Sequence, residues 1–222
     1  MQDTTSSDLA HALQSSVAFY CGFDPTAPAL HAGNLVALVA MTHLRAAGHR
    51  PIAVVGGATG RVGDPSGRKA ERDPLAEEAV RTNLQGIASN IRTVFRNADA
   101  VLGTKGQEPS VLDNMEWYQE VNFIDFLRDV GKHVRLQQML KRESVSARLA
   151  SEAGLSFAEF SYQLLQAYDF LHLHEKFDCM LQVLSNEMSP RDPGRLAAAT
   201  SGATSRPAAS WCASAAARWC TA

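Results

Sequence analysis

The feature that most constrains the fold is the junction at residues 20–34, where a short apolar segment passes through a loop containing proline and glycine into a long apolar helix. Residues 17–21 are rich in β-branched and aromatic side chains, which favours a strand. Apolar residues recur near helical spacing from Asn34, and Gly48 suits the end of that helix. Because a helix N terminus presents unpaired N–H groups, the junction indicates either a phosphate site or the ordinary turn found in many α/β proteins.

A second strand is predicted at residues 51–55, a continuous apolar run of the kind buried in a parallel sheet. The glycine-rich loop that follows, residues 56–68, has the spacing G-x-x-G-x-x-G and contains Asp64. Ligands bind at the carboxyl ends of parallel strands, so we expect both loops to face one crevice, unless the second is only a connector. Arg68 and Arg72 either overhang that crevice or form a solvated face.

Further elements are predicted to cover the sheet. Residues 74–97 predict a long amphipathic surface helix, and residues 110–114 predict a third strand. Residues 123–130 and 133–148 predict two helices separated by Gly131. This region is the most basic of the chain, but its acidic residues are interleaved, which favours a solvated or subunit-contact face over RNA binding.

Residues 159–174 are apolar nearly all round, which predicts a buried helix. Within it, Tyr162, Gln166 and Asp169 lie at i, i+4 and i+7 and therefore share one stripe. Buried polar groups need partners, so the stripe indicates either a polar ligand or an internal hydrogen-bond network.

Composition narrows the function classes. The 222 residues are 45% hydrophobic and carry a net charge of −2, so a core is expected and no overall basic field indicates nucleic acid. The four cysteines lack C-x-x-C spacing, and His172 and His174 lie on different helix faces, so we expect a reducing compartment and no protein-bound metal. No run approaches the roughly 18 apolar residues that cross a bilayer, and no membrane partner is expected.

Five segments between residues 19 and 183 carry a more specific pattern: YCGFDPTAPALHAGN, GHRPIAVVGGATGRVGDPSGR, VLDNMEWY, FLRDVGKH and FAEFSYQLLQAYDF. Together they resemble the tyrosyl-tRNA synthetases, which are class I aminoacyl-tRNA synthetases, in their bacterial and mitochondrial form. Residues 31–34, HAGN, stand where the class has its HIGH signature, with Asn34 in place of the second histidine. The resemblance implies an α/β fold, with a Rossmann-like parallel sheet and a HIGH-type nucleotide loop.

The resemblance also implies a site for tyrosine. Tyr20 and Asp64 would read the phenol hydroxyl, while Tyr162, Gln166 and Asp169 would bind the amine side. A site built to hydrogen-bond a hydroxyl rejects phenylalanine, because its own buried groups would stay unpaired.

The resemblance implies residues for ATP as well. The implied ATP contacts are Cys21, Gly22, Asp24 and Gly33. The implied catalytic residues, which would hold the pyrophosphate leaving group and the phosphates, are Thr26, His31, Asn34, Arg68 and Arg72. The tyrosine carboxylate would attack the α-phosphorus of ATP, which arrives with Mg²⁺ as a substrate, and the tyrosyl group would pass from the adenylate to tRNA(Tyr). The family also implies a homodimer, here through residues 123–160.

The resemblance ends at Val183. The family continues with GGSDQWGNITAG, a KMSKS-type loop and a tRNA-binding domain, whereas residues 184–222 are rich in Ala, Ser, Arg and Pro. Residues 197–208, AAATSGATSRPA, are what one choice of codons for GGSDQWGNITAG gives when it is read one base late. We therefore expect three parts: a polar segment at 1–16, a truncated catalytic domain at 17–183, and an irregular, frameshifted tail at 184–222. The sheet would be incomplete at its C-terminal side and open at that edge.

Two functions follow from this pattern. One is a tyrosine-tRNA ligase whose activity is impaired by the missing loop. The alternative is a catalytically inactive splice or gene-model product that at most binds tyrosine or dimerises. A different nucleotidyl-transferring α/β enzyme is disfavoured by the polar stripe at residues 162–169. The intron-like tail and the VLDNMEWY segment favour the mitochondrial matrix, with the cytoplasm as the alternative because no transit peptide is visible.

Overall fold

A five-stranded sheet forms the centre of the computed structural model, which describes residues 13–64, 75–103, 107–152, 154–183 and 196–198. The strand order is β3-β2-β1-β4-β5. The first four strands are parallel and comprise β1 (Ala18–Phe23), β2 (Arg50–Val55), β3 (Ser110–Asp113) and β4 (Cys179–Val183). The predicted α/β fold with a Rossmann-like parallel sheet is confirmed.

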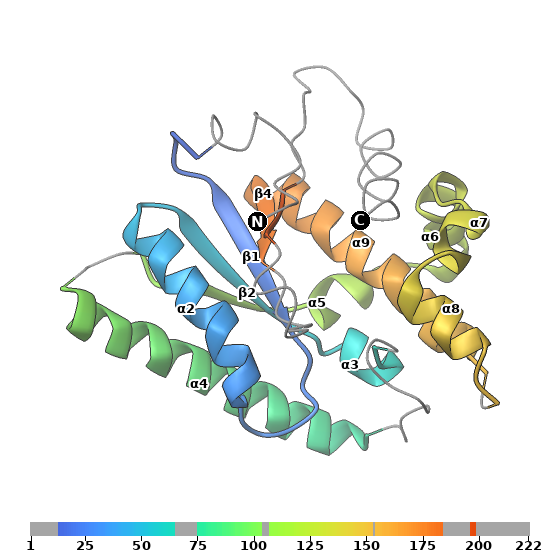
Figure 1. Cartoon of the computed structure of the whole chain (residues 1–222), viewed down its shortest axis with the longest axis horizontal. Helices are drawn as coiled ribbons and strands as arrows, with labels where there is room; N and C mark the ends of the chain where they lie inside the picture. Colours follow the sequence, from blue (N-terminus) through green and yellow to red (C-terminus); the bar gives the residue numbers. More distant parts are fainter. Residues whose placement is uncertain (1–12, 65–74, 104–106, 153, 184–195, 199–222) are drawn as a thin grey trace.

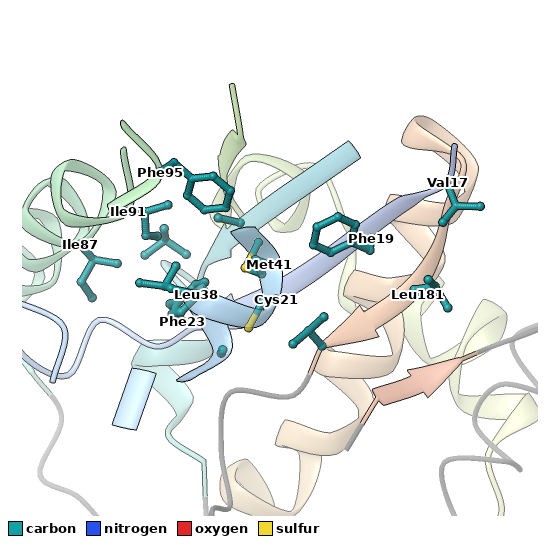
Figure 2. Close-up of a cluster of buried hydrophobic side chains, with 14 residues drawn as sticks. Val17, Phe19, Cys21, Phe23, Leu38, Met41, Ile87, Ile91, Phe95 and Leu181 are labelled. Atoms are coloured by element: carbon teal, nitrogen blue, oxygen red, sulfur yellow. The ribbon is translucent and has the colours of Figure 1, made fainter. Parts of the chain in front are cut away.

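Two helices cover one face of the sheet, α2 (Ala32–Ala46) and α4 (Glu77–Leu102), with the short α3 (Thr59–Val62) between them in the chain. Their apolar sides meet the sheet in a core (Figure 2) that includes Phe19, Phe23, Leu38, Met41 and Ile91. The predicted helix at 74–97 is confirmed, although it starts at Glu77 and continues to Leu102. This core holds the carboxyl ends of β1 and β2 in place beneath the two predicted loops.

The opposite face is covered by α9 (Phe157–Phe177) and α5 (Met115–Tyr118). Tyr20 of β1 stacks on Phe170 of α9, with ring centroids 5.5 Å apart. The prediction of a helix here is confirmed, but the prediction that it is buried all round is wrong. Its buried residues are Asp169, Phe170 and Leu173, together with Glu159, which pairs with Arg148; the other described residues of the helix are half-buried or exposed.

Short helices fill the chain between α5 and α9: α6 (Phe123–Asp129), η1 (Gly131–His133), α7 (Leu136–Leu140) and α8 (Glu143–Leu149). They gather beside α9, away from α2 and α4 (Figure 1). The single helix predicted at 133–148 is therefore wrong, because Arg135 and Arg142 adopt extended conformations, with ψ angles of 116° and 137°. A buried ion pair between Arg148 and Glu159, 2.7 Å long, ties α8 to α9.

The edge of the sheet at β4 carries a fifth strand. β5 (Leu196–Ala198) pairs antiparallel with β4, placing Ala197 opposite Gln182. The prediction of an irregular segment is wrong for these three residues, and β4 is not an open edge where they pair. The remainder of the predicted tail lies outside the described residues, as do residues 1–12.

Among the described residues, no group of three or more His, Cys, Asp or Glu side chains could hold a metal ion. No helix in the same part of the chain has the length and apolar character needed to cross a membrane.

Candidate functional site

The loops after β1 and β2 meet at one edge of the sheet. The Gly56 N–H donates to the Phe23 carbonyl at 3.0 Å, and the Thr59 hydroxyl donates to Asp24 Oδ1 at 3.1 Å. A side chain at Gly60 would collide with the ring of Pro25, so the two backbones approach as closely as glycine permits. The prediction that both loops face the same place is confirmed.

Asp169 is the most strongly constrained carboxylate at this edge. It is buried in α9, where its Oδ1 accepts a 2.9 Å hydrogen bond from the Trp117 indole and its Oδ2 accepts a 3.1 Å hydrogen bond from the Asn114 amide. Burial raises the pKa of Asp169 to about 7, and the hydrogen bonds from Asn114 and Trp117 oppose that rise. Asp169 therefore changes charge close to neutral pH.

Asn114 connects this carboxylate to the glycine-rich loop. Its side chain is fully buried directly after β3, and its Oδ1 accepts a 2.8 Å hydrogen bond from the Ala58 N–H. Its Nδ2 donates to both Thr59 Oγ1 and Asp169 Oδ2, at 3.1 Å each. Asn114 thus joins residues from three separate segments and fixes the position of Asp169 relative to the loop.

Tyr162 closes the other end of the same network. Its hydroxyl donates to Asp24 Oδ2 at 2.8 Å, while Thr59 donates to the other Asp24 oxygen. Burial is the largest cause of the raised pKa of Tyr162, and the negative charges of Asp24 and Asp64 are the next largest causes. Tyr162 therefore lies beside Asp24 and Asp64, and Gln166 is half-buried one turn further along α9.

Tyr20 lies on the Asp169 side of the site. It is buried in β1, and its hydroxyl has no hydrogen-bond partner among the described residues. Burial raises the pKa of Tyr20, and Asp169 is the next largest cause. Asp169 is thus the foremost charged neighbour of Tyr20, whereas Asp24 and then Asp64 are the foremost charged neighbours of Tyr162.

The N terminus of α2 is built differently, from local contacts. His31 is the N-cap, and its Nδ1 accepts a 3.0 Å hydrogen bond from the Gly33 N–H. In return, Asn34 Oδ1 accepts from the His31 N–H at 3.2 Å, which completes a capping box. Thr26, His31 and Gly33 are exposed here.

Two predicted ATP contacts, Cys21 and Gly22, lie within β1 itself. The Cys21 side chain is fully buried among Leu38 and Met41 on the α2 side of the sheet (Figure 2). A thiol in that position packs as an apolar core group. Gly22 is half-buried, and Asp24 follows at the end of the strand. The predicted phosphate-binding residues Arg68 and Arg72 lie outside the described residues.

Asn114 and Trp117 were not predicted as site residues. Both lie in the VLDNMEWY segment directly after the third strand, so their place at the carboxyl edge of the sheet was a usable signal. His172 stacks on Trp117 at 4.5 Å between ring centroids. This contact explains the position of His172 on α9 without a metal.

Comparison with known proteins agrees with this geometry. A family model described as tRNA synthetases class I (W and Y) matches residues 12–183. The chain is 47% identical over 170 residues to the mitochondrial tyrosine-tRNA ligase of Drosophila melanogaster, covering 74% of this chain and 37% of that protein. It is 51% identical over 170 residues to the tyrosine-tRNA ligase of Opitutus terrae, covering 77% of this chain and 39% of that protein.

A solved structure gives the same result. The C-terminally truncated mitochondrial tyrosyl-tRNA synthetase of Aspergillus nidulans superposes with a TM-score of 0.73 at 31% identity, covering 79% of this chain and 51% of that one. The chain spans less than two fifths of the length of the two curated relatives it matches. It belongs to the class I tRNA synthetases of the tryptophan and tyrosine type and carries a tyrosyl-tRNA synthetase domain over residues 12–183.

Proposed function

We propose that this chain is the tyrosine- and ATP-binding part of a tyrosine-tRNA ligase. In that reaction the tyrosine carboxylate attacks the α-phosphorus of ATP, the bond to the β-phosphate breaks, and pyrophosphate leaves with Mg²⁺. The tyrosyl group of the adenylate then passes to tRNA(Tyr). The observation that carries the proposal is the buried Asp169 carboxylate, held by Trp117 and Asn114, beside the hydroxyl of Tyr20, which has no hydrogen-bond partner among the described residues. A buried group without a partner destabilises the empty site, and a ligand hydroxyl would relieve that cost.

The two carboxylates take opposite roles to those that the resemblance implied. Asp169 and Tyr20 read the phenol hydroxyl, because Asp169 is the foremost charged neighbour of Tyr20. Asp64, Tyr162 and Gln166 hold the ammonium group. Asp64 acts on Tyr162, and Gln166 lies one helical turn further along α9.

ATP would lie across the N terminus of α2, with its phosphates near Thr26, His31 and Gly33. Catalysis there would come from positioning and from donors matched to the charge of the transition state. In the described residues His31 already accepts the Gly33 N–H, and Asn34 already accepts the His31 N–H. These groups at the N terminus of α2 are therefore already engaged and should bind ATP weakly. We expect the 222-residue chain to show little tyrosine-dependent pyrophosphate exchange.

Thermal unfolding with added amino acids tests the function. A ligand that binds only the folded state raises the midpoint by mass action. Tyrosine should raise the midpoint of the 222-residue chain, while phenylalanine and tryptophan at the same concentration should leave it unchanged. A shift with tryptophan but not tyrosine would assign the chain to the other branch of its family, and equal shifts with all three would contradict a hydroxyl-reading site.

Homodimerisation is the second part of the proposal. Large apolar side chains are exposed on four neighbouring helices, α6 to α9 (Figure 1), and this α6–α9 surface comprises Phe123, Ile124, Leu127, Leu136, Leu140, Leu149 and Phe157. Such a patch on a soluble domain marks an interaction surface. Its position matches the region through which the resemblance implies a homodimer, so the occupant is a second copy of this chain.

Sedimentation velocity tests this interface. The unsubstituted chain should sediment as a dimer, and Ile124→Asp should convert it to a monomer because it places a charge in the apolar contact. Val101→Asp on α4 is the matched control, since Val101 is 84% exposed and lies outside the surface. If the Ile124→Asp variant still formed dimers, the α6–α9 surface would not be the dimer interface.

For location, we propose the mitochondrial matrix. The support is the similarity to mitochondrial ligases, although the bacterial ligase of Opitutus terrae matches equally well. Protease protection of the endogenous protein in isolated mitochondria tests this, and recovery only in the cytosolic fraction would contradict it.

A further inference from the structure

Thr59 is a buried residue of the glycine-rich loop to which the proposed roles give no function. It is the first residue of α3, which packs against α9, and it is 4% exposed. Its hydroxyl donates to Asp24 Oδ1 and accepts from Asn114 Nδ2, each at 3.1 Å. A hydroxyl has one hydrogen and Nδ2 is a donor, so that hydrogen is directed at Asp24. The Thr59 hydroxyl therefore serves the carboxylate of Asp24.

Asp24 lies between donors from two different helices. It follows the end of β1, and its Oδ1 accepts from Thr59 in α3. Its Oδ2 accepts from the Tyr162 hydroxyl in α9 at 2.8 Å. A rotation of the carboxylate would break at least one of these hydrogen bonds. Thr59 and Tyr162 together therefore fix the orientation of Asp24.

Gly56 leaves the space that this contact needs. A side chain at position 56 would collide with both Thr59 Oγ1 and Asp24 Oδ1. Gly56 is not among the glycines with a positive φ angle, so its backbone conformation does not itself require glycine. The absence of a side chain at position 56 is therefore explained by the close approach of Thr59 to Asp24.

The charge of Asp24 reaches the proposed tyrosine site. Burial is the largest cause of the raised pKa of Tyr162 and of Asp169, and the negative charge of Asp24 adds to both. Tyr162 is one of the residues proposed to hold the ammonium group, so a cation bound there meets the field of Asp24. Because the attraction between opposite charges depends on their separation, a displaced Asp24 should weaken the binding of a cation.

We propose that Thr59 is a positioning residue for the ammonium side of the tyrosine site, which acts by holding the Asp24 carboxylate beside Tyr162. This inference rests on the proposed function. Thr59 acts through Asp24, so it needs no contact with the ligand. Its removal should penalise ligands that carry an ammonium group and spare those that lack one. The hydroxyl end keeps its own hydrogen bonds, because Asn114 still donates to Asp169.

Three ligands separate this role from a purely structural one. Tyrosine has an ammonium group, a carboxylate and a phenol; tyramine lacks the carboxylate, and 3-(4-hydroxyphenyl)propanoate lacks the ammonium group. Thr59→Val keeps the shape of the side chain and removes its hydroxyl. In calorimetric titrations of the 222-residue chain, it should weaken tyrosine and tyramine about five- to tenfold each. Binding of 3-(4-hydroxyphenyl)propanoate should stay within about twofold.

Two further variants and a control sharpen the test. Thr59→Ser restores the hydroxyl and should bind tyrosine within about twofold of the unsubstituted chain. Gly56→Ala displaces the same contact and should repeat the ligand pattern of Thr59→Val. Thr82→Val is the matched control, because Thr82 is exposed and its hydroxyl donates to the Glu78 carbonyl of its own helix. Circular dichroism verifies that each variant is folded, and Gly56→Ala carries the test if Thr59→Val is not.

Several outcomes would overturn the inference. Equal losses for all three ligands would mean that Thr59 acts on the fold as a whole, and a Thr59→Ser variant as weak as Thr59→Val would mean that the hydroxyl is not responsible. If the unsubstituted chain binds tyrosine selectively and Thr59→Val changes nothing, the inference fails and the proposed function stands. If the unsubstituted chain binds no tyrosine, the proposed function fails for this chain, and the inference fails with it.

Discussion

The two ends of the proposed site are built in contrasting ways. At the hydroxyl end, Asp169 is buried and held by Trp117 and Asn114, residues more than 50 positions away in the chain. At the phosphate end, the described residues give the side chains of His31 and Asn34 hydrogen bonds with residues two and three positions away, and His31 is exposed. The hydroxyl end is therefore formed by the tertiary fold and should discriminate between ligands. The phosphate end is formed by a helix cap and should depend on groups beyond these residues.

The largest expected effect comes from removing the charge at the hydroxyl end. Asp169→Asn keeps the shape but turns an amide NH₂ toward the Trp117 or Asn114 donor. We expect tyrosine affinity to weaken by about 2–3 kcal/mol, roughly 30- to 150-fold, at pH 8 where Asp169 is mostly ionised. Calorimetric titration measures this loss.

Asp129→Asn on α6 is the control, since Asp129 is exposed and pairs with Arg128 on the surface. An Asp169→Asn variant that binds tyrosine normally would show that the hydroxyl end is not organised around this carboxylate.

Next in size is a pH effect on folding. Burial raises the pKa of Asp169 from 3.8 to about 7. Between these values the folded chain holds a proton that the unfolded chain has released, so raising the pH destabilises the fold; below about 4 and above about 7 the effect is constant. Relative to the unsubstituted chain, Asp169→Asn should gain about 2 kcal/mol of unfolding free energy between pH 5 and pH 7.

Urea unfolding of both proteins at pH 5, 6 and 7 provides the measurement. A stability difference that does not change with pH would mean that Asp169 titrates at an ordinary carboxyl value. The hydroxyl end would then contain no carboxylate whose pKa is raised by burial.

Trp117→Phe should have a smaller effect. It removes the donor to Asp169 Oδ1 but keeps an aromatic ring against His172. Because this hydrogen bond lowers the pKa of Asp169, the pH midpoint for tyrosine binding should move upward, and affinity at pH 7 should fall by about 1–2 kcal/mol. Tyrosine titrations between pH 6 and pH 9 check this, and an unchanged midpoint would exclude Trp117 from control of Asp169.

The smallest effect is expected at the phosphate end. His31→Ala removes the side-chain cap of α2 and should lower the unfolding free energy by about 1 kcal/mol. Tyrosine affinity should stay within about twofold, because the cap shares no hydrogen bond with the Asp169 network in the part of the chain that the structure describes. Urea unfolding and calorimetry together test this, and a large loss of tyrosine affinity would show that the two ends are coupled.

Local patterns predicted most of the framework. The apolar run at 51–55 and the periodicity from Asn34 and from residue 74 identified β2, α2 and α4, since these elements depend on short-range spacing. The breaks at Arg135 and Arg142 could not be predicted in this way. The conformation there depends on tertiary packing, including the buried pair of Arg148 with Glu159.

The site followed the same division. The stripe of Tyr162, Gln166 and Asp169 on one helix was visible in the sequence. The structure contains the internal hydrogen-bond network that was one interpretation of the stripe, and the polar ligand that was the other is our proposal. The spacing of residues along the chain could not show which side chains lie next to Asp169 and which lie next to Asp64. That pairing depends on how α9 crosses β1 and on where Asn114 emerges from β3.

The central claim is that this chain retains a selective tyrosine end, and calorimetric titration of the unsubstituted 222-residue protein with tyrosine and with phenylalanine tests it most directly. We predict saturable binding of tyrosine with one site per chain, and phenylalanine binding at least about 100-fold weaker, because phenylalanine offers no hydroxyl to Tyr20 and Asp169. Equal binding of the two amino acids, or no binding of tyrosine by a folded chain, would contradict the account.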